Sequence, residues 1–149
     1  MIRKAKISEV KDIQRLINLY AERGMMLARS LSELYDNIRD YFVYEEKEKI
    51  LGTCALHIWW EDLAEIKSLV VEESLQNKGI GTNLVKEALK EAKLLGIKKV
   101  FVLTYIPKFF EKLGFREIDK SQMPQKIWGE CVNCAKFPDC QETALVIQI

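Results

Sequence analysis

Long apolar runs, an excess of charge of either sign and histidine are all scarce in this sequence. No apolar run approaches the roughly 20 residues of a membrane-spanning helix, and the start of the chain, Met1–Lys4, lacks the apolar core of a secretory signal. A balance of 23 Lys and Arg against 22 Asp and Glu indicates neither a nucleic-acid surface nor an acidic polymer as partner. We therefore expect a cytoplasmic protein with no nucleic-acid or membrane partner. A length of 149 residues predicts a single domain over residues 1–149.

The most informative stretch runs from Glu65 to Gly96. A strand is predicted over Glu65–Val71, followed by a short polar connection and then by Q-N-K-G-I-G at 76–81. A helix follows directly, because apolar residues recur at 84, 85, 88, 89, 92 and 95 with helical spacing. The free N–H groups at the start of a helix attract anions, and glycines let the backbone approach a bulky diphosphate. The stretch therefore predicts a phosphate-binding loop.

Neighbouring residues exclude two common phosphate-binding motifs. A P-loop ends in G-K-[ST], but Thr82 follows Gly81 without a lysine. A dinucleotide fingerprint needs a third glycine, and Leu84 stands at that position. The spacing Q-x-x-G-x-G after a strand instead resembles the loop that holds the acetyl-CoA pyrophosphate in the GNAT superfamily of N-acetyltransferases. A glycine-bearing surface turn is the structural alternative.

The other segments resemble the GNAT order of elements over nearly the whole chain. Strands are expected over 2–6, 41–44, 50–60, 98–104, 115–119 and 143–149, with Gly52 at a bulge. Helices are expected after the N-cap Ser8, after the capping box of Ser30 and Glu33, and from Pro107. The resemblance implies an α/β fold, with a mixed, mostly antiparallel sheet of six to seven strands, a central splay and about four flanking helices. Residues 120–142 are expected to form a long loop.

The resemblance also implies how acetyl-CoA is held. Backbone groups of the central strand would bond the pantetheine arm, and the glycine loop would cradle the pyrophosphate. The implied contacts are Leu69, Val70, Val71, Gln76, Asn77, Lys78, Gly79, Ile80, Gly81, Thr82 and Phe110.

One departure from the GNAT pattern concerns the acid that protonates the departing thiolate. The segment F-E-K-L-G-F at 110–115 looks like the superfamily's Y-E-K-L-G-F, so Phe110 stands where many members carry a tyrosine acid. Tyr105 is the nearest substitute, and a tyrosine that merely caps a strand end is the alternative. A thiol with a pKa near that of cysteine, about 8.5, is also a fair leaving group without an acid.

Glu65 is the candidate general base. It lies eleven residues before Gln76 in an A-E-I stretch, which is similar to the histone-acetylating branch, where the base glutamate has the same offset. An amine near neutral pH is mostly protonated, and a partly buried carboxylate with a raised pKa can remove that proton through water. The alternative is a structural glutamate paired with Lys67 on the same strand face.

Two short segments indicate the amine substrate. Residues 25–34 and 126–128 resemble the short, single-domain N-acetylglutamate synthases, which transfer acetyl from acetyl-CoA to the α-amine of L-glutamate at the first step of bacterial arginine biosynthesis. A dicarboxylate needs fixed cations, for which Arg29, Lys126 and Lys67 are candidates, and Ser30 could add a hydroxyl. A solvated Arg29 and a pure capping role for Ser30 are the structural alternatives. Competing functions are acetylation of a protein N-terminus or a polyamine, and a CoA-binding sensor without activity.

The cysteines leave several interpretations open. Cys131, Cys134 and Cys140 give C-x2-C-x5-C, whose first half is a usual zinc half-site, but structural zinc takes four ligands and no fourth is evident. Zinc, a disulfide and free thiols remain alternatives, a zinc-held interaction module is a further function, and we assign no metal ligand. Finally, the alternation over Thr143–Ile149 suggests an edge strand that could pair in a homodimer.

Overall fold

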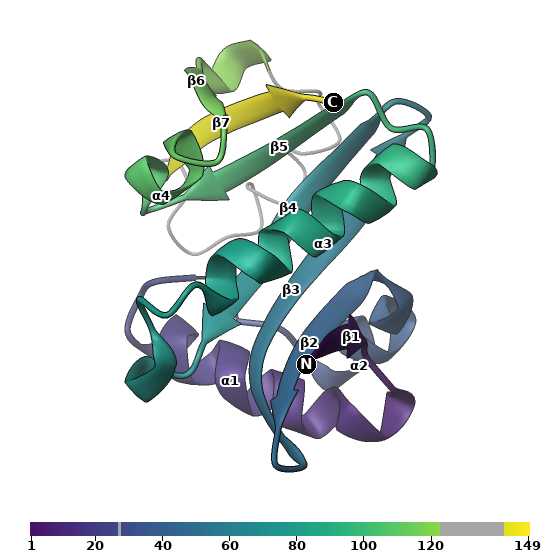
Figure 1. The fold of residues 1–149 in the computed structure, drawn as a ribbon, viewed down its shortest axis with the longest axis vertical. Helices are drawn as coiled ribbons and strands as arrows, with labels where there is room; N and C mark the ends of the chain where they lie inside the picture. The colour runs from purple at the N-terminus through teal and green to yellow at the C-terminus, as the bar shows by residue number, and fades with distance from the viewer. Residues whose placement is uncertain (27, 123–141) are drawn as a thin grey trace.

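The computed structural model of the protein describes residues 1–26, 28–122 and 142–149. These residues form one seven-stranded sheet in the order β1-β2-β3-β4-β5-β7-β6, with four α-helices (Figure 1). Among the described strands, only β4 and β5 pair in parallel, which confirms the predicted α/β class and mostly antiparallel sheet. The elements are β1 (Ile2–Lys4), α1 (Val10–Glu22), α2 (Leu31–Asp36), β2 (Tyr41–Glu46), β3 (Lys49–Trp60), β4 (Leu63–Val71), α3 (Ile80–Leu94), β5 (Lys99–Thr104), α4 (Pro107–Glu111), β6 (Arg116–Ile118) and β7 (Thr143–Gln148).

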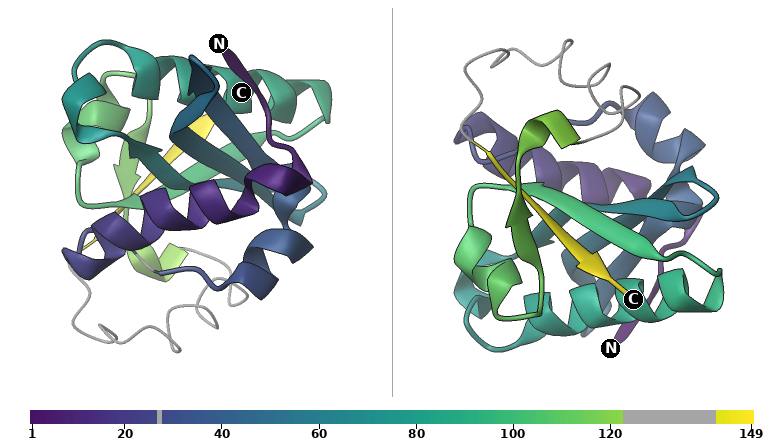
Figure 2. Two further views of the ribbon diagram at one scale, coloured as in Figure 1. Left: turned by 90° about the horizontal axis from the view of Figure 1, so that it is seen from below. Right: turned by 90° about the horizontal axis from the view of Figure 1, so that it is seen from above.

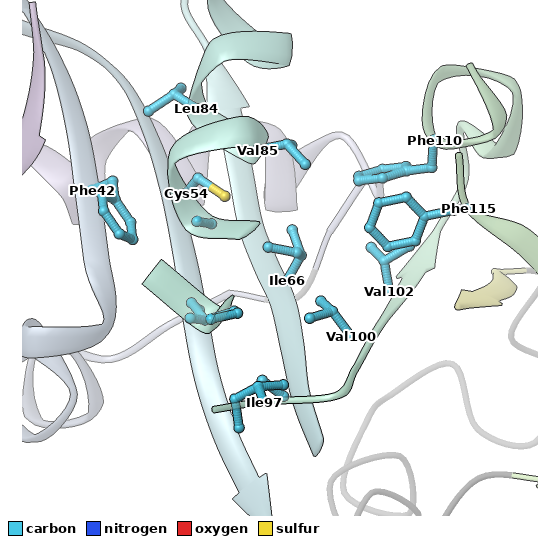
Figure 3. Close-up of a cluster of buried hydrophobic side chains, with 14 of the residues drawn as sticks. Phe42, Cys54, Ile66, Leu84, Val85, Ile97, Val100, Val102, Phe110 and Phe115 are labelled. Atoms are coloured by element: carbon cyan, nitrogen blue, oxygen red, sulfur yellow. The ribbon is translucent and has the colours of Figure 1, made fainter. Parts of the chain in front are cut away.

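Helices cover both faces of the sheet. α3 lies across one face, whereas α1 and α2 lie against the other (Figure 2). The buried side chains of α3 fall on the predicted apolar stripe and pack on Ile66 and Val102 of the central strands (Figure 3). The stripe of α1 buries Val10, Ile13 and Ile17 on the opposite face. No helix within the described residues is both long and apolar enough to cross a membrane.

The central splay expected for the fold is present between β4 and β5. Their parallel pairing runs from Leu63 and Lys99 to Ile66 and Val102 and does not continue to the strand ends. β4 nevertheless extends to Val71, where β3 remains its partner. The backbone of β4 beyond Ile66 therefore faces the gap between the two strands.

A β-bulge in β4 marks the start of this gap. Thr53 pairs with Val70 and Ala55 with Lys67, so β4 contains one residue more than β3 between these pairs. Ser68 has a φ of 55° there, is 7% exposed, and shares a hydrogen bond of 3.2 Å with the hydroxyl of Tyr41. The extra residue reverses the alternation of side chains, and Val70 consequently packs towards α1.

Two local predictions are confirmed. The Ser30 hydroxyl accepts a hydrogen bond of 3.1 Å from the backbone N–H of Glu33 and so caps α2. The register of β2 and β3 shifts beside Gly52, because Tyr44 pairs with Gly52 while Glu45 pairs with Ile50.

Two other predictions are wrong. Ser8 does not cap the first helix, because it lies within a short 3₁₀ turn, Ile7–Glu9, where Glu9 accepts the backbone N–H of Lys6 at 2.8 Å. The C-terminal strand is not an edge strand, because β7 pairs with β5 on one side and with β6 on the other. Alternation indicates which face of a strand is buried and not which strands flank it, so the argument for a homodimer at this strand fails.

The predicted substrate-binding residue Lys126 lies outside the described residues. The three C-terminal cysteines, Cys131, Cys134 and Cys140, for which zinc, a disulfide and free thiols were left open, lie outside them as well. Within the described part of the chain, no group of three or more His, Cys, Asp or Glu side chains is placed to hold a metal ion.

The bulge predicts different effects for two substitutions of Ser68. Ser68→Val places a β-branched residue at positive φ and removes the hydrogen bond to Tyr41, so we expect the free energy of unfolding to fall by about 2–3 kcal/mol. Ser68→Gly relieves the backbone while losing the same hydrogen bond, so its stability should stay within about 1 kcal/mol of the wild type. Urea unfolding measures both, and equal stability of the two variants would show that the bulge does not constrain this position.

Candidate functional site

A cavity of about 620 Å³ lies in the splay between β4 and β5. It is bounded by the second half of β4, the end of β5, the loop before α4, the glycine loop before α3 and the segment before α2. Three predicted site residues within the described chain do not line it, namely Ser30, Lys78 and Ile80. The predicted residues that do line it are Arg29, Glu65, Lys67, Leu69, Val70, Val71, Gln76, Asn77, Gly79, Gly81, Thr82, Tyr105 and Phe110.

The glycine loop presents backbone donors at one end of this cavity. Gly79 is the N-cap of α3 with a φ of 85°, and as a glycine it has no side chain with which to cap the helix. The N–H groups of Ile80, Gly81 and Thr82 fall in the first turn, where the helix offers no acceptor of its own. These donors and the positive end of the helix dipole fit a diphosphate.

Gln76 ties this loop to the sheet. Its side-chain amide donates hydrogen bonds of 3.1 Å to the carbonyl oxygen of Val71 and to the hydroxyl of Tyr20. Tyr20 in turn donates to the same carbonyl at 3.0 Å, and burial raises the pKa of this phenol. Tyr20 was not predicted as a site residue, because its place on the apolar stripe of α1 indicates only a core position.

The middle of the cavity is largely apolar. Met25, Met26, Ile106 and Phe109 contribute to its wall, next to the part of β4 that does not pair with β5. Gly81 lies against Phe109, whose nearest ring carbon is 3.5 Å from the position of a Cβ atom. Apolar walls beside a strand edge that does not pair with β5 fit a pantetheine arm, which carries amides on a flexible apolar chain.

Glu65 lies at the other end of the cavity. It precedes the bulge and points to the face of α1 and α2, opposite to its neighbour Ile66, which packs towards α3. Its side chain is 5% exposed, and its Oε1 accepts a hydrogen bond of 2.9 Å from the indole Nε1 of Trp59. The structure therefore places a largely buried carboxylate in the wall of the cavity.

Two cationic side chains, Arg29 and Lys67, line the same end of the cavity as Glu65. Arg29 is held through its backbone, which bonds Asn18 and Gln14, and its Nη1 lies 3.2 Å from Oε2 of Glu33. The Nζ atom of Lys67 lies 6.0 Å from the ring centre of Trp59. Both cations also border a smaller cavity of about 190 Å³ beside the first. The lining of the larger cavity also includes Lys112 and the carboxylates of Glu65 and Glu142, so it carries charges of both signs.

The position of the missing tyrosine is part of the core. Phe110 is 1% exposed and makes edge-to-face contacts with Phe109 and Phe115, at ring-centre distances of 5.0 and 5.3 Å. Tyr105 follows β5 and lines the cavity. The predicted substitute for the tyrosine acid is therefore present at the site.

Comparison with known proteins identifies relatives of the whole chain. A sequence profile of the acetyltransferase (GNAT) family matches residues 9–115. An uncharacterised N-acetyltransferase of Chlorobaculum tepidum is 42% identical over 145 residues, which cover 97% of this chain and 94% of that protein. The amino-acid acetyltransferase of Mycobacterium tuberculosis is 33% identical over 133 residues, which cover 87% of this chain and 76% of that protein.

Solved structures show the same arrangement. A Mycobacterium tuberculosis protein in complex with CoA and a second ligand has a TM-score of 0.84 and 28% identity, covering 100% of this chain and 99% of that one. The N-acetylglutamate synthase of Neisseria gonorrhoeae, complexed with CoA and N-acetyl-glutamate, has a TM-score of 0.91 and 25% identity. That match covers 99% of this chain but 34% of the other, so this chain spans about a third of that enzyme.

The glycine loop predicts a selective effect of Gly79→Ala on CoA binding. Gly79 and Gly96 have similar positive φ angles, 85° and 88°, and a Cβ atom at either position meets nothing within 4 Å. Alanine at either position should therefore lower the free energy of unfolding by a similar amount, about 1–2 kcal/mol. We expect only Gly79→Ala to weaken CoA binding, by about tenfold for the loss of one aligned donor.

Calorimetric titration with CoA and urea unfolding measure the two effects. Gly96→Ala is the matched control, since it lies at the far end of α3. Equal CoA affinity in both variants would contradict the assignment of this loop.

Proposed function

This chain belongs to the acetyltransferase (GNAT) family, and we propose that it transfers the acetyl group of acetyl-CoA to the α-amine of L-glutamate. The observation that carries the proposal is the convergence in one cavity of an anion-binding loop, a buried carboxylate and two cations. The carboxylate is Glu65, and the cations are Arg29 and Lys67. N-acetylglutamate, the product of this reaction, is the intermediate that the first step of arginine biosynthesis supplies.

The two ends of the cavity divide the substrates in this proposal. The pyrophosphate of acetyl-CoA binds at the N-terminus of α3, and its pantetheine arm follows the unpaired edge of β4 towards Glu65. L-glutamate binds between β4 and the segment before α2, where Arg29 and Lys67 offset its two carboxylates. Lys126 remains a third candidate cation. This arrangement puts the α-amine next to the acetyl group.

Transfer then needs a base at the amine. Glu65, directly or through a water molecule, accepts a proton from the ammonium group and makes its nitrogen nucleophilic. The nitrogen attacks the thioester carbonyl, and backbone N–H groups of Leu69–Val71 stabilise the negative charge that develops on the oxygen. The C–S bond breaks, the attacking nitrogen releases its second proton to water and becomes the amide, and the thiolate of CoA leaves. Tyr105 or water protonates this thiolate.

Relatives support this choice of substrate. The Mycobacterium tuberculosis relative is named an amino-acid acetyltransferase. The Neisseria gonorrhoeae neighbour, whose structure holds CoA and N-acetyl-glutamate, matches the chain over almost its full length. We extend these activities to this chain because its cavity offers a base and two cations in one place.

Release of CoA thiol in the presence of a panel of amines tests the proposal. We expect kcat/KM to be highest with L-glutamate, and lower by about tenfold or more with L-glutamine, which lacks one carboxylate. L-aspartate, spermidine and a peptide amine complete the panel.

Each result has a definite meaning. Release of CoA thiol with another amine alone would show that L-glutamate is not the substrate, and it would agree with the acetyltransferase assignment. CoA binding without release for any amine would instead favour the sensor, for which the replacement of the tyrosine acid by Phe110 is the relevant observation.

Two variants should change different kinetic constants. Glu65→Gln keeps an oxygen for the Trp59 indole but cannot accept a proton, so kcat should fall by about 10²–10⁴-fold at an unchanged KM for acetyl-CoA. Arg29→Gln removes a cation that meets the substrate, so the KM for L-glutamate should rise by about tenfold or more. Arg15→Gln, which breaks an exposed ion pair with Asp12 on α1, is the control. Wild-type constants in Glu65→Gln would remove Glu65 from the mechanism.

A further inference from the structure

Trp59 contacts Glu65 from the neighbouring strand. His57 of β3 lies directly opposite Glu65, and the register of the two strands becomes irregular between Ile58 and Trp60. The indole of Trp59 reaches across from this irregular position, and its Nε1 donates the hydrogen bond of 2.9 Å to Oε1 of Glu65. A carboxylate that is only 5% exposed is costly to ionise without donors. A hydrogen bond to its charged form offsets part of that cost.

Neighbouring side chains fix the position of the Trp59 ring. His57 meets it edge to face, with a ring-centre distance of 4.9 Å and an interplanar angle of 81°. Asp40 holds His57 in turn, through a contact of 2.8 Å between Oδ2 and Nδ1. The ammonium group of Lys67 lies within cation–π range, and Trp59 also packs on the cluster around Phe101. An indole supported in this way is a preorganised donor.

We propose that Trp59 is a positioning residue for acetyl transfer, which keeps Glu65 ionised and aims its carboxylate at the amine. The inference rests on the proposed function, in which Glu65 is the base. The indole N–H is a donor that neither accepts nor releases a proton near neutral pH, so it cannot take part in proton transfer itself. Its effect is to set the pH range over which Glu65 is charged and able to accept a proton.

Other charged and titratable groups line the same cavity as Glu65 or lie next to it in the sheet. Because every one of them is retained when Trp59 is replaced by phenylalanine, the comparison isolates the indole N–H. The groups are His57 with Asp40 from β3 and the segment before β2, Lys67 from β4, Arg29 from the segment before α2, Tyr20 of α1, Tyr105 after β5, Lys112 after α4, and Glu142 before β7.

Titration of the Glu65 carboxyl carbon by NMR tests the inference without any turnover. The protein is labelled with ¹³C at glutamate, and the Glu65 resonance is the one that Glu65→Gln removes. In Trp59→Phe we expect the pKa of Glu65 to rise by about one pH unit or more, because a hydrogen bond to the charged form is lost. Trp60→Phe is the matched control, since Trp60 is the adjacent indole and is 59% exposed.

The pH dependence of activity supplies the second readout. Glu65 loses its function as a base when it is protonated, so a higher pKa moves the acid limb of the kcat/KM profile to higher pH. We expect that shift in Trp59→Phe with an unchanged KM for acetyl-CoA, and no shift in Trp60→Phe. Thermal unfolding confirms that the variant is folded, and Trp59→Met, which also fills space without an N–H donor, serves if the phenylalanine variant does not fold.

The outcomes separate this inference from the proposed function. If wild-type protein acetylates no amine, the proposed function fails and the positioning role fails with it. If the wild type is active but neither the carboxyl titration nor the acid limb moves in Trp59→Phe, the inference about Trp59 fails alone.

Discussion

Hydrogen bonding between β4 and β5 ends at Ile66 and Val102, and the candidate site depends on this break. Backbone donors and acceptors that would otherwise pair within the sheet face a cavity instead. The sheet tolerates the gap because β3 still pairs with β4 to its end, while β7 pairs with β5 along its whole length. Each half of the sheet is therefore supported on its outer side.

The bulge at Ser68 determines which side chains reach the cavity. Before it, Glu65 and Lys67 face α1 and α2, whereas Ile66 faces α3. After it the alternation is reversed, so Val70 rather than Leu69 packs on α1. One extra residue thus separates a polar segment of β4, which carries the carboxylate, from a segment that contributes mainly backbone groups.

The charges of the site are local and do not appear in the composition. A net charge of +1 over 149 residues gives no sign of an anion-binding protein. In the folded chain, however, the start of α3 and the side chains of Arg29 and Lys67 bring positive potential to one cavity. A carboxylate and two cations therefore lie at one end of the cavity, and the backbone donors of the glycine loop lie at the other.

The sequence alone was sufficient to predict the elements and the anion-binding loop, because both depend on local signals. The helical spacing from Leu84 to Ala92 and the positions of Gly79 and Gly81 predict a loop and a helix whatever surrounds them. The same loop, with the strand before it and the helix after it, carried the resemblance to the GNAT superfamily, and the family match over residues 9–115 confirms it. Element ends were less certain, as the wrong cap at Ser8 shows.

Only the tertiary structure decided which residues meet. The order β5-β7-β6 depends on long-range pairing that no periodicity encodes, and for this reason the C-terminal strand was wrongly expected at an edge. The bulge at Ser68 could not be predicted, because no glycine stands at this position of positive φ. Tyr20 and Trp59 have the positions of ordinary apolar residues in the sequence, although both donate hydrogen bonds in the structure. The hydrogen bond from Tyr20 to Val71 spans 51 residues and forms because α1 packs on the sheet. The hydrogen bond from Trp59 to Glu65 spans 6 residues and forms because β3 pairs with β4.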